Sequence, residues 1–424
     1  MNPAAMGLYG RIKLASSSMM VDFFIAAREV LRHRRRSFVG MAAVVSGVAA
    51  LLLAAGFIEW TYLAMREDTI HSGLGHMHVV RGGYGAAGSA DSYENLLPER
   101  SPERDLIARF PGVTKVAPRL SFSGLISLND ATLSFVGEGM DPASESELAD
   151  ATILMAGVGL SVSEPNGIIV GKGLADNLGA KVGDTVVMVA NTSRGSINAV
   201  EAKIRGTFAT MSKAHDDAAL RAPLPMVQEL LRVSGAHKWV VFLDRTNKTR
   251  AVMSELKRQL SGKDLEVLPW YDMVDFYSKT VALYSKQVAV MKLIIAVIII
   301  LSVSTTLTTT IMERTGEIGT AMALGVPRAR LLRRFLFEGM LIGIVGGIVG
   351  VVLGYLLAKA ISTIGIPMPP PPGMARGYIG RILVTPGLAF DAVSLALVTT
   401  LLASIYPAWK ASRMAIVDAL RSNR

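Results

Sequence analysis

One short motif, Gly171-Lys172-Gly173, could be read as a phosphate-binding loop. Such a loop needs a glycine five residues before its Gly-Lys pair and a Ser or Thr directly after the lysine. Asn166 and Gly173 occupy those two positions, and no other Gly-Lys pair in the chain is followed by Ser or Thr. We therefore predict that this chain does not bind nucleotide in this way. If it does ATP-driven work, another subunit must supply the ATPase.

The remaining candidates for chemistry are histidines and hydroxyl side chains, because the sequence has no cysteine. Without cysteine there can be no disulfide, thiolate metal site or thiol nucleophile. His76 and His78 could both ligate a metal, but alternation along a strand explains their spacing better. No serine belongs to a recognisable nucleophile–His–acid set. We therefore predict no catalytic residue, no metal and no cofactor in this chain, and we do not expect it to be an enzyme.

Residues 313–338 form the most unusual stretch of the sequence. They contain five arginines and lie between two long apolar runs. Gly325-Val-Pro327 would interrupt a helix there, because glycine is a poor helix former and proline lacks the backbone N–H. A polar, helix-prone segment in this place is suited to binding a partner in the cytoplasm.

The composition is that of a membrane protein. Hydrophobic residues make up 51% of the 424 residues, and the mean hydropathy is +0.41, which is too apolar for an ordinary soluble chain. The net charge of +10 could suggest a nucleic-acid partner, but its basic excess lies in residues 1–37, 313–334 and 407–424, beside apolar stretches. This is the positive-inside pattern of membrane proteins. We therefore expect membrane lipids, and no nucleic acid, as partners.

Four apolar stretches approach or exceed the length of about 20 residues that a spanning helix needs. They are Ser37–Ile58, Leu293–Met312, Gly339–Ala358 and Ala389–Tyr406. The first is longer than the apolar part of a signal peptide, about 7–15 residues, so we expect it to remain as an anchor. The basic clusters place both termini and the 313–334 loop in the cytoplasm.

Residues 66–286 have the composition of a soluble domain and are long enough to build a core,. Strand-like runs separated by turn residues lie at His78–Val80, Thr132–Val136, Gly167–Val170, Thr185–Val189 and Trp239–Leu243,. Helix-like pieces lie at Gly173–Leu178, Pro225–Val233 and Thr249–Leu260. We therefore predict a large α+β extracytoplasmic domain. Residues 270–292 should form a helical stalk that runs without a break into the second span.

The fold class predicted is thus a membrane protein with four transmembrane α-helices and a large α+β extracytoplasmic domain. In chain order the parts are a cytoplasmic amphipathic helix (1–36), the first span and stalk (37–65), the extracytoplasmic domain (66–270), a stalk and the second span (271–312), a cytoplasmic helix (313–338), the third span (339–358), an outer Pro-rich loop (359–388), the fourth span (389–406) and a cytoplasmic tail (407–424).

The segment before the first span has an apolar stripe at helical spacing. Its members are Met20, Phe23, Phe24, Ala27, Val30 and Leu31, with Asp22, Arg28, Glu29 and Arg32 off the stripe,. We favour a helix that lies on the inner leaflet with its arginines near anionic headgroups. The alternative is a plain cytoplasmic extension of the first span.

The third span carries two overlapping series of glycines spaced three or four residues apart. The glycines are Gly339, Gly343, Gly346, Gly347, Gly350 and Gly354. Such residues let a neighbouring backbone approach closely, so we predict tight packing against another span. The sequence leaves open whether that span belongs to the same chain or to a second copy. The Pro-rich run 367–372 should be a stiff lid or spacer.

Several stretches resemble the MacB/FtsX/LolC–LolE superfamily of ABC transporter permeases. Residues 27–41 look like the family's N-terminal helix and first span, 313–339 like its cytoplasmic coupling segment and 406–421 like its C-terminal signature. Residues 136–142 and 167–184 resemble the MacB-like periplasmic core domain. The likeness covers essentially the whole chain and is most specific in the coupling segment.

This resemblance implies a bacterial inner-membrane protein that works as a homodimer or heterodimer, clamped by two copies of an ABC ATPase. ATP and Mg²⁺ would bind the ATPase, not this chain. Because no ATPase domain precedes the first span, we expect a LolC/LolE-like arrangement with a separate ATPase. The residues assigned to ATPase coupling are Glu313, Gly316, Glu317, Leu324, Gly325, Arg328, Arg330 and Leu331.

Three functions remain open at this point. The first is extraction of lipoprotein, lipid or other outer-leaflet cargo, which we favour. The second is MacB-like efflux of peptides or drugs, with a periplasmic adaptor. The third is FtsX-like signalling, in which the outer domain activates a cell-wall hydrolase. The sequence does not identify the cargo.

Overall fold

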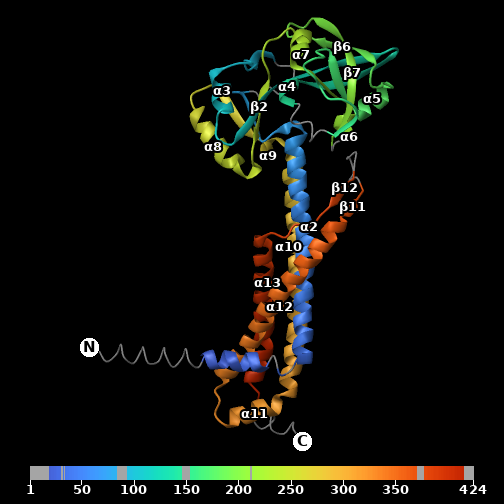
Figure 1. Cartoon of the computed structure of the whole chain (residues 1–424). Helices are drawn as coiled ribbons and strands as arrows, with labels where there is room; N and C mark the ends of the chain where they lie inside the picture. Colours follow the sequence, from blue (N-terminus) through green and yellow to red (C-terminus); the bar gives the residue numbers. More distant parts are fainter. Residues whose placement is uncertain are drawn as a thin grey trace, which may run out of the picture. The chain divides into compact units, whose positions relative to one another are not determined.

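The computed structural model describes residues 19–29, 32, 34–83, 93–145, 153–210, 213–369 and 377–414 (Figure 1). The chain divides into two compact units, which we describe separately. The helical unit comprises Met1–Tyr62, Val281–Ile366 and Ile379–Arg424, and the sheet unit comprises Leu63–Thr280 and Pro367–Tyr378. Half of the Pro-rich run that we expect to be a lid or spacer, residues 370–372, lies outside the described residues.

Four long helices form the frame of the helical unit. They are α2 (Arg34–Thr69), α10 (Asp275–Glu313), α12 (Arg328–Ile364) and α13 (Pro386–Ser412). Within the described part of the chain, these four helices are long and apolar enough to cross a membrane. The prediction of four transmembrane helices is therefore confirmed. Each helix extends beyond the apolar stretch that marked it in the sequence.

Local signals explain where these helices begin and end. The Thr385 hydroxyl caps α13 by accepting a hydrogen bond from the backbone N–H of Leu388 at 3.2 Å, and Pro386 follows as the first helical residue,. Pro327 precedes α12, which ends at Gly365 with a φ of +78°. Inside the unit, side chains such as Leu51, Ile299, Ile342 and Ala396 join all four helices in one apolar cluster.

The sheet unit is built on one mixed sheet of ten strands. The strands are β1 (Met77–Arg81), β2 (Val113–Leu128), β3 (Ala131–Met140), β4 (Ile153–Gly157), β5 (Gly167–Gly171), β6 (Thr185–Asn191), β7 (Ile197–Ala209), β8 (Ala219–Pro223), β9 (Lys238–Leu243) and β10 (Leu265–Pro269). Their order is β10-β1-β9-β2-β3-β8-β5-β7-β4, and β6 pairs with both β2 and β7. The α+β fold class is confirmed.

Because β6 joins β2 to β7, six of the strands close into a ring: β2-β3-β8-β5-β7-β6. The ring encloses a core of large side chains, among them Phe122, Phe135, Met188 and Leu220. Helices α5 (Lys172–Leu178) and α7 (Leu224–Leu231) contribute to the same core. Every second residue of a strand points inward, which is why Leu120, Phe122 and Ile126 are all buried.

A second core lies beside the ring, on β9, β1 and β10. It includes Met77, Trp239 and Val267 from these strands. Helices α3 (Pro102–Ala108) and α8 (Thr249–Gln259) cover it with Ile107 and Leu256. The long strand β2 belongs to both parts, since its first half pairs with β9 and its second half with β3 and β6.

Smaller elements complete the described residues. In the sheet unit these are α4 (Pro142–Glu145), α6 (Lys213–Asp216) and α9 (Trp270–Met273). Strands β11 (Ile366–Met368) and β12 (Tyr378–Gly380) pair with each other. The expected unbroken stalk helix over 270–292 needs a correction, because Val274 has non-helical angles and separates α9 from α10. From Asp275 onward α10 is continuous.

Candidate functional site

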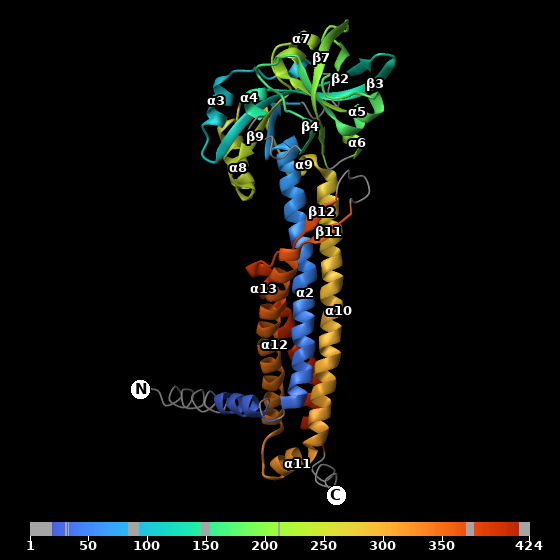
Figure 2. The ribbon, with the colours of Figure 1, turned by 45° about the vertical axis from the view of Figure 1, so that its right-hand side comes forward.

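The segment between the second and third long helices contains a short helix, α11 (Thr315–Ala323) (Figure 2). It ends in a Schellman motif: the N–H of Val326 donates to the carbonyl of Ala321 at 3.1 Å, and the N–H of Gly325 donates to that of Met322 at 3.0 Å,. Gly325 has a φ of +88°, in the region that favours glycine,. Residues 313–338 are thus two helical pieces, α11 and the start of α12, on either side of the Gly325-Val-Pro327 turn.

One side of α11 is exposed. Glu317, Thr320 and Leu324 follow one another at intervals of three or four residues, so they share one side of the helix. All three are exposed, Leu324 to 82%. Glu313, one turn before Glu317, is also exposed, as are Gly325 and Arg328 after the helix, whereas Gly316 is half-buried. The segment therefore presents an acidic and apolar surface with an arginine beside it.

The opposite side of α11 is anchored in a small apolar core. Ile318 and Met322 pack with residues from the adjoining ends of α10, α12 and α13: Ile311, Leu331, Phe335, Ala408 and Ala411. Leu331 is only 5% exposed. We had expected Leu331 to contact a partner, but its side chain is turned into this core. A load applied to α11 would reach three spanning helices through these contacts.

Arginines at the start of α12 converge on a single carboxylate from the N-terminal segment 19–29. Asp22 is 1% exposed and receives hydrogen bonds from Arg333 and from Nε of Arg334, the latter at 3.1 Å. Nε of Arg330 lies 3.9 Å from the same carboxylate. Burial would raise the pKa of Asp22, but the hydrogen bonds and charges of Arg333 and Arg334 outweigh it and lower that pKa,.

This arrangement adds a contact with protein to the amphipathic helix expected over residues 19–36. The residue placed off the stripe, Asp22, is buried against protein, while Met20 and Phe24 of the stripe are exposed. Phe23 packs edge-on against Phe337, with ring centroids 5.9 Å apart. The stripe members Val30 and Leu31 lie outside the described residues. The segment is therefore docked through its acidic side and leaves apolar side chains facing away.

The two glycine series of α12 face different helices of the same chain. A Cβ on Gly343 would lie 2.1 Å from the Thr400 hydroxyl of α13, and Gly339 and Gly347 face α13 as well. A Cβ on Gly350 would lie 2.7 Å from Val48 of α2. Gly346 and Gly354 face α2 as well. The structure thus places α12 between α2 and α13, with close backbone approach on both sides.

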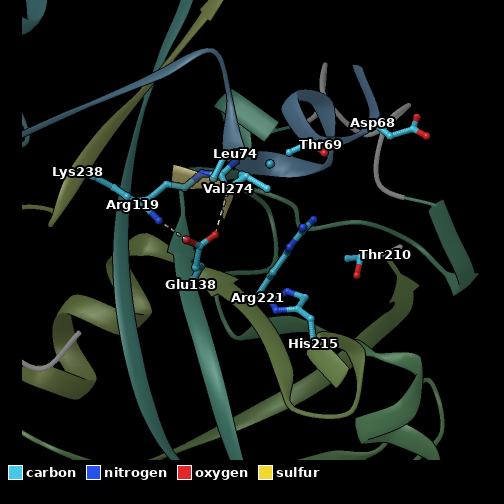
Figure 3. A pocket seen from close by; sticks show the side chains of 11 residues that line it. Asp68, Thr69, Leu74, Arg119, Glu138, Thr210, His215, Arg221, Lys238 and Val274 are labelled. Atoms are coloured by element: carbon cyan, nitrogen blue, oxygen red, sulfur yellow. Dashed lines mark hydrogen bonds and ion pairs between the residues drawn. The ribbon is translucent and has the colours of Figure 1, made fainter. Parts of the chain in front are cut away.

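Charged side chains line a cavity of about 440 Å³ in the sheet unit (Figure 3). Glu138 of β3 accepts hydrogen bonds from Arg119 of β2 at 2.9 Å and from Lys238 of β9 at 2.7 Å. Burial would raise the pKa of Glu138, but Lys238 and Arg119 hold it well below its usual range. Figure 3 shows the Arg221 side chain directed into the same cavity, and its guanidinium stacks on Phe208 at 4.5 Å,.

The cavity also contacts a distorted turn. Gly73, in the π-helical turn η1 (Ile70–Leu74), has a φ of +128°, and a Cβ there would lie 3.0 Å from Nη1 of Arg119. His78 is hydrogen-bonded to the carbonyl of Leu74 at 2.8 Å. Sequence reasoning missed this cluster. The available signal was the presence of Arg119, Glu138 and Arg221 inside otherwise apolar strands.

His76 and His78 are both buried and hydrogen-bonded. Nδ1 of His76 accepts from the backbone N–H of Leu243 at 3.1 Å. Burial lowers the pKa of His76 to about 4 and that of His78 to about 3, so both rings are neutral near pH 7. Among the described residues, no group of three or more His, Cys, Asp or Glu side chains is arranged to hold a metal ion.

Two family models match this chain, one after the other along the sequence. The family model of the MacB-like periplasmic core domain matches residues 37–259, and that of the FtsX-like permease C-terminal matches residues 289–416. Four apolar helices together with this α/β domain define a membrane permease. The chain belongs to the MacB/FtsX/LolC superfamily of ABC transporter permeases.

Individual relatives are distant. The macrolide export ATP-binding/permease protein MacB of Acinetobacter baylyi is 23% identical over 343 residues, which cover 76% of this chain and 49% of the relative. The lipoprotein-releasing system transmembrane protein LolC of Xylella fastidiosa is 25% identical over 273 residues, which cover 60% of this chain and 64% of the relative. The chain spans about half the length of the first MacB relatives that it matches.

Among solved structures, the periplasmic region of MacB from Actinobacillus actinomycetemcomitans is similar to part of this chain. The match has 13% identity and a TM-score of 0.35, and it covers 49% of this chain and 94% of that structure. The extracellular domain of the ABC-type transporter YknZ matches at 13% identity with a TM-score of 0.33, covering 45% of this chain and 98% of that structure.

Proposed function

We propose that this chain is the permease subunit of an ABC transporter in a bacterial inner membrane, with both termini in the cytoplasm. A separate ATPase, in two copies, binds α11 and couples its cycle to movement of the sheet unit on the other side of the membrane. ATP and Mg²⁺ stay on the ATPase. The permease works as a dimer, either with a second copy or with a related chain.

The exposed side of α11 is the observation that carries this proposal. Glu317 and Leu324 are displayed to solvent, while Ile318 and Met322 on the other side join α10, α12 and α13. A short helix with one free side and one side locked into several spanning helices is suited to pass on a push. For ATP to shift the permease, the ATPase must bind two conformations with different affinity.

The test is a charge reversal at the exposed side. We expect Glu317→Lys to abolish co-purification of an ABC ATPase from native membranes and to remove the ATP hydrolysis of the purified complex. Glu201→Lys, an exposed position on β7 of the sheet unit, serves as the matched control and should leave both unchanged. If Glu317→Lys retains full binding and turnover, the coupling assignment is wrong.

The cargo that we favour is lipoprotein, lipid or another molecule taken from the outer leaflet. The similarity to LolC supports this choice, because that relative is named as part of a lipoprotein-releasing system. The similarity to MacB supports a second candidate, export of peptides or drugs with a periplasmic adaptor. Native mass spectrometry of the complex separates the two, since bound lipid or lipoprotein supports the first and bound peptide or drug the second.

A further inference from the structure

The angle between α11 and α12 is not set by a continuous helix. The ladder of helical hydrogen bonds is interrupted between Ala323 and Arg328 by the Gly325-Val-Pro327 turn. Pro327 has an extended conformation, with φ −66° and ψ 142°. Such a joint needs side-chain contacts to hold one geometry, because few backbone hydrogen bonds cross it. The apolar core of Ile318, Met322, Leu331 and Phe335 supplies some of these contacts, and polar contacts supply the rest.

Segment 19–29 makes those contacts on both sides of the joint. The Glu29 carboxylate pairs with Nη2 of Arg314 at 2.5 Å, directly before α11. Asp22 pairs with Arg333 and Arg334 within the first two turns of α12. A helical segment therefore holds both pieces by its two ends.

The spacing of the contacting residues fits a single side of a helix. Asp22, Ala26 and Glu29 are separated by four and three residues, which places them in one row. Asp22 and Ala26 are both buried. The row therefore packs against protein along its whole length, and the contact is not limited to one ion pair.

The chemistry of the Asp22 contact favours a fixed geometry. Its two carboxylate oxygens receive hydrogen bonds from different arginines: Oδ1 from Arg334 and Oδ2 from Arg333. Planar guanidinium groups bind a carboxylate in preferred directions. Separating a buried ion pair leaves an unpaired buried charge, which is strongly destabilising. The Asp22 contact therefore favours the arrangement in which the first turns of α12 meet segment 19–29.

Other charged groups near the joint belong to the same network. Glu317 of α11 pairs with Nε of Arg314 at 3.3 Å. Glu338 of α12 is buried and interacts electrostatically with Arg314 and Glu29. The Arg314 guanidinium thus interacts with one carboxylate each from the N-terminal segment, from α11 and from α12.

We propose that residues 19–29 act as a splint that holds α11 at a set angle to α12, with Asp22 and Glu29 as its positioning residues. The inference rests on the proposed function, because the angle matters when an ATPase pushes on α11. It assigns to the N-terminal segment a part in coupling that is separate from any contact with lipid. Without the splint, the ATPase still binds α11, but only the apolar core holds the joint. Part of the movement of α11 then bends the joint and does not reach α12.

The first test measures the joint itself. Since the chain has no cysteine, spin labels can be placed on Cys introduced at Thr320 on α11 and at Ile348 on α12, both exposed. We expect one narrow distance distribution in the full chain and a distribution about twofold wider with Asp22→Asn or Glu29→Gln. Asp22→Glu should keep the distance distribution narrow. Asp130→Asn, at an exposed turn of the sheet unit, is the matched control and should leave the distribution unchanged.

The second test measures coupling in the assembled complex. Asp22→Asn should leave the Kd for the ATPase within about twofold and lower permease-stimulated ATP turnover about fivefold, a typical coupling factor. Asp22→Glu, which keeps the carboxylate, should retain most of the permease-stimulated ATP turnover. An unchanged distance distribution in the Asp22→Asn, Glu29→Gln double variant would overturn the splint.

The two tests fail independently. If no ATPase binds the unaltered chain, the proposed function is wrong, while the distance measurement, which needs no ATPase, still decides on the splint. If the distribution widens in Asp22→Asn but turnover stays at the level of the unaltered complex, the joint is held by the segment and the coupling role is refuted.

Discussion

The two units of this molecule are packed by opposite means. In the helical unit, glycines of α12 remove side chains so that α2 and α13 can approach its backbone. In the sheet unit, large side chains such as Phe122, Phe135 and Trp239 fill two cores. The difference follows from the solvent. Water drives apolar side chains together. Lipid is as apolar as the helices, so close van der Waals packing is the main interaction that holds the helices together.

Removing a large side chain should therefore damage the sheet unit most. Phe122 is fully buried and stacks edge-on with Phe135 at 5.2 Å. We expect Phe122→Ala to lower the free energy of unfolding of this unit by about 3–5 kcal/mol, from lost burial and a cavity. Hydrogen–deuterium exchange of the full chain should show faster exchange in β2, β3 and β6 and no change in α12. Equal acceleration in both units would contradict the separation of their cores.

The charged cavity gives the next largest effect. Glu138→Ala leaves Arg119, which is 1% exposed, and Lys238 without their shared carboxylate. We expect a loss of about 2–3 kcal/mol, because buried charges are expensive without a partner. Chemical unfolding followed by the fluorescence of Trp239 and Trp270 measures it. Glu201→Ala, at an exposed position, should leave the free energy of unfolding almost unchanged. A similar loss in Glu138→Ala and Glu201→Ala would refute the role of the cavity.

Adding a methyl group should damage the helical unit. Gly350→Ala places a Cβ 2.7 Å from Val48 and 3.0 Å from the backbone oxygen of Val45, so we expect a loss of about 1–3 kcal/mol from overpacking,. Gly347→Ala is the matched control, since its Cβ would meet its neighbours at 3.5 Å, an ordinary contact. The midpoint of thermal unfolding in detergent should fall for Gly350→Ala and stay unchanged for Gly347→Ala. The reverse order would disprove the assignment of these faces.

His78 should give the sheet unit a dependence on pH. His78 is neutral when folded, with a pKa near 3, but protonates at about 6.5 when unfolded. Because the unfolded state then binds one more proton, stability should fall by about 1.4 kcal/mol per pH unit as pH drops below 6.5. The group is surrounded by Lys238, Glu138 and Arg119. In unfolding curves at several pH values, His78→Gln should flatten this slope, and an unchanged slope would rule His78 out.

The sequence predicted features that depend on neighbours along the chain. The four spans, the two glycine series and five strand-like runs were visible as local patterns, and those runs correspond to β1, β3, β5, β6 and β9. Strand β2 was missed because Pro118, Arg119 and several serines interrupt its apolar pattern. Strand β7 was overlooked although a strand signal was present, since apolar and charged residues alternate along Val200–Arg205,.

Features that depend on distant partners could not be predicted. The partner strands of β6 are set by packing and not by its own residues, so the closed ring has no local signature. Asp22 lies more than three hundred positions from its arginines, and in the sequence it was one charge beside an apolar stripe. Leu331 was assigned to the ATPase contact together with the rest of the coupling segment, whereas the helix turns it inward.

The shared strand β2 has a mechanical consequence. β9 and then β6 pair along one edge of β2, and β3 pairs along the other. A pull parallel to β2 would load many of these hydrogen bonds in shear at the same moment, so none breaks until several do. A pull across the strand would open them one at a time. The sheet unit should therefore be stiff along β2 and yield when it is peeled at right angles to it.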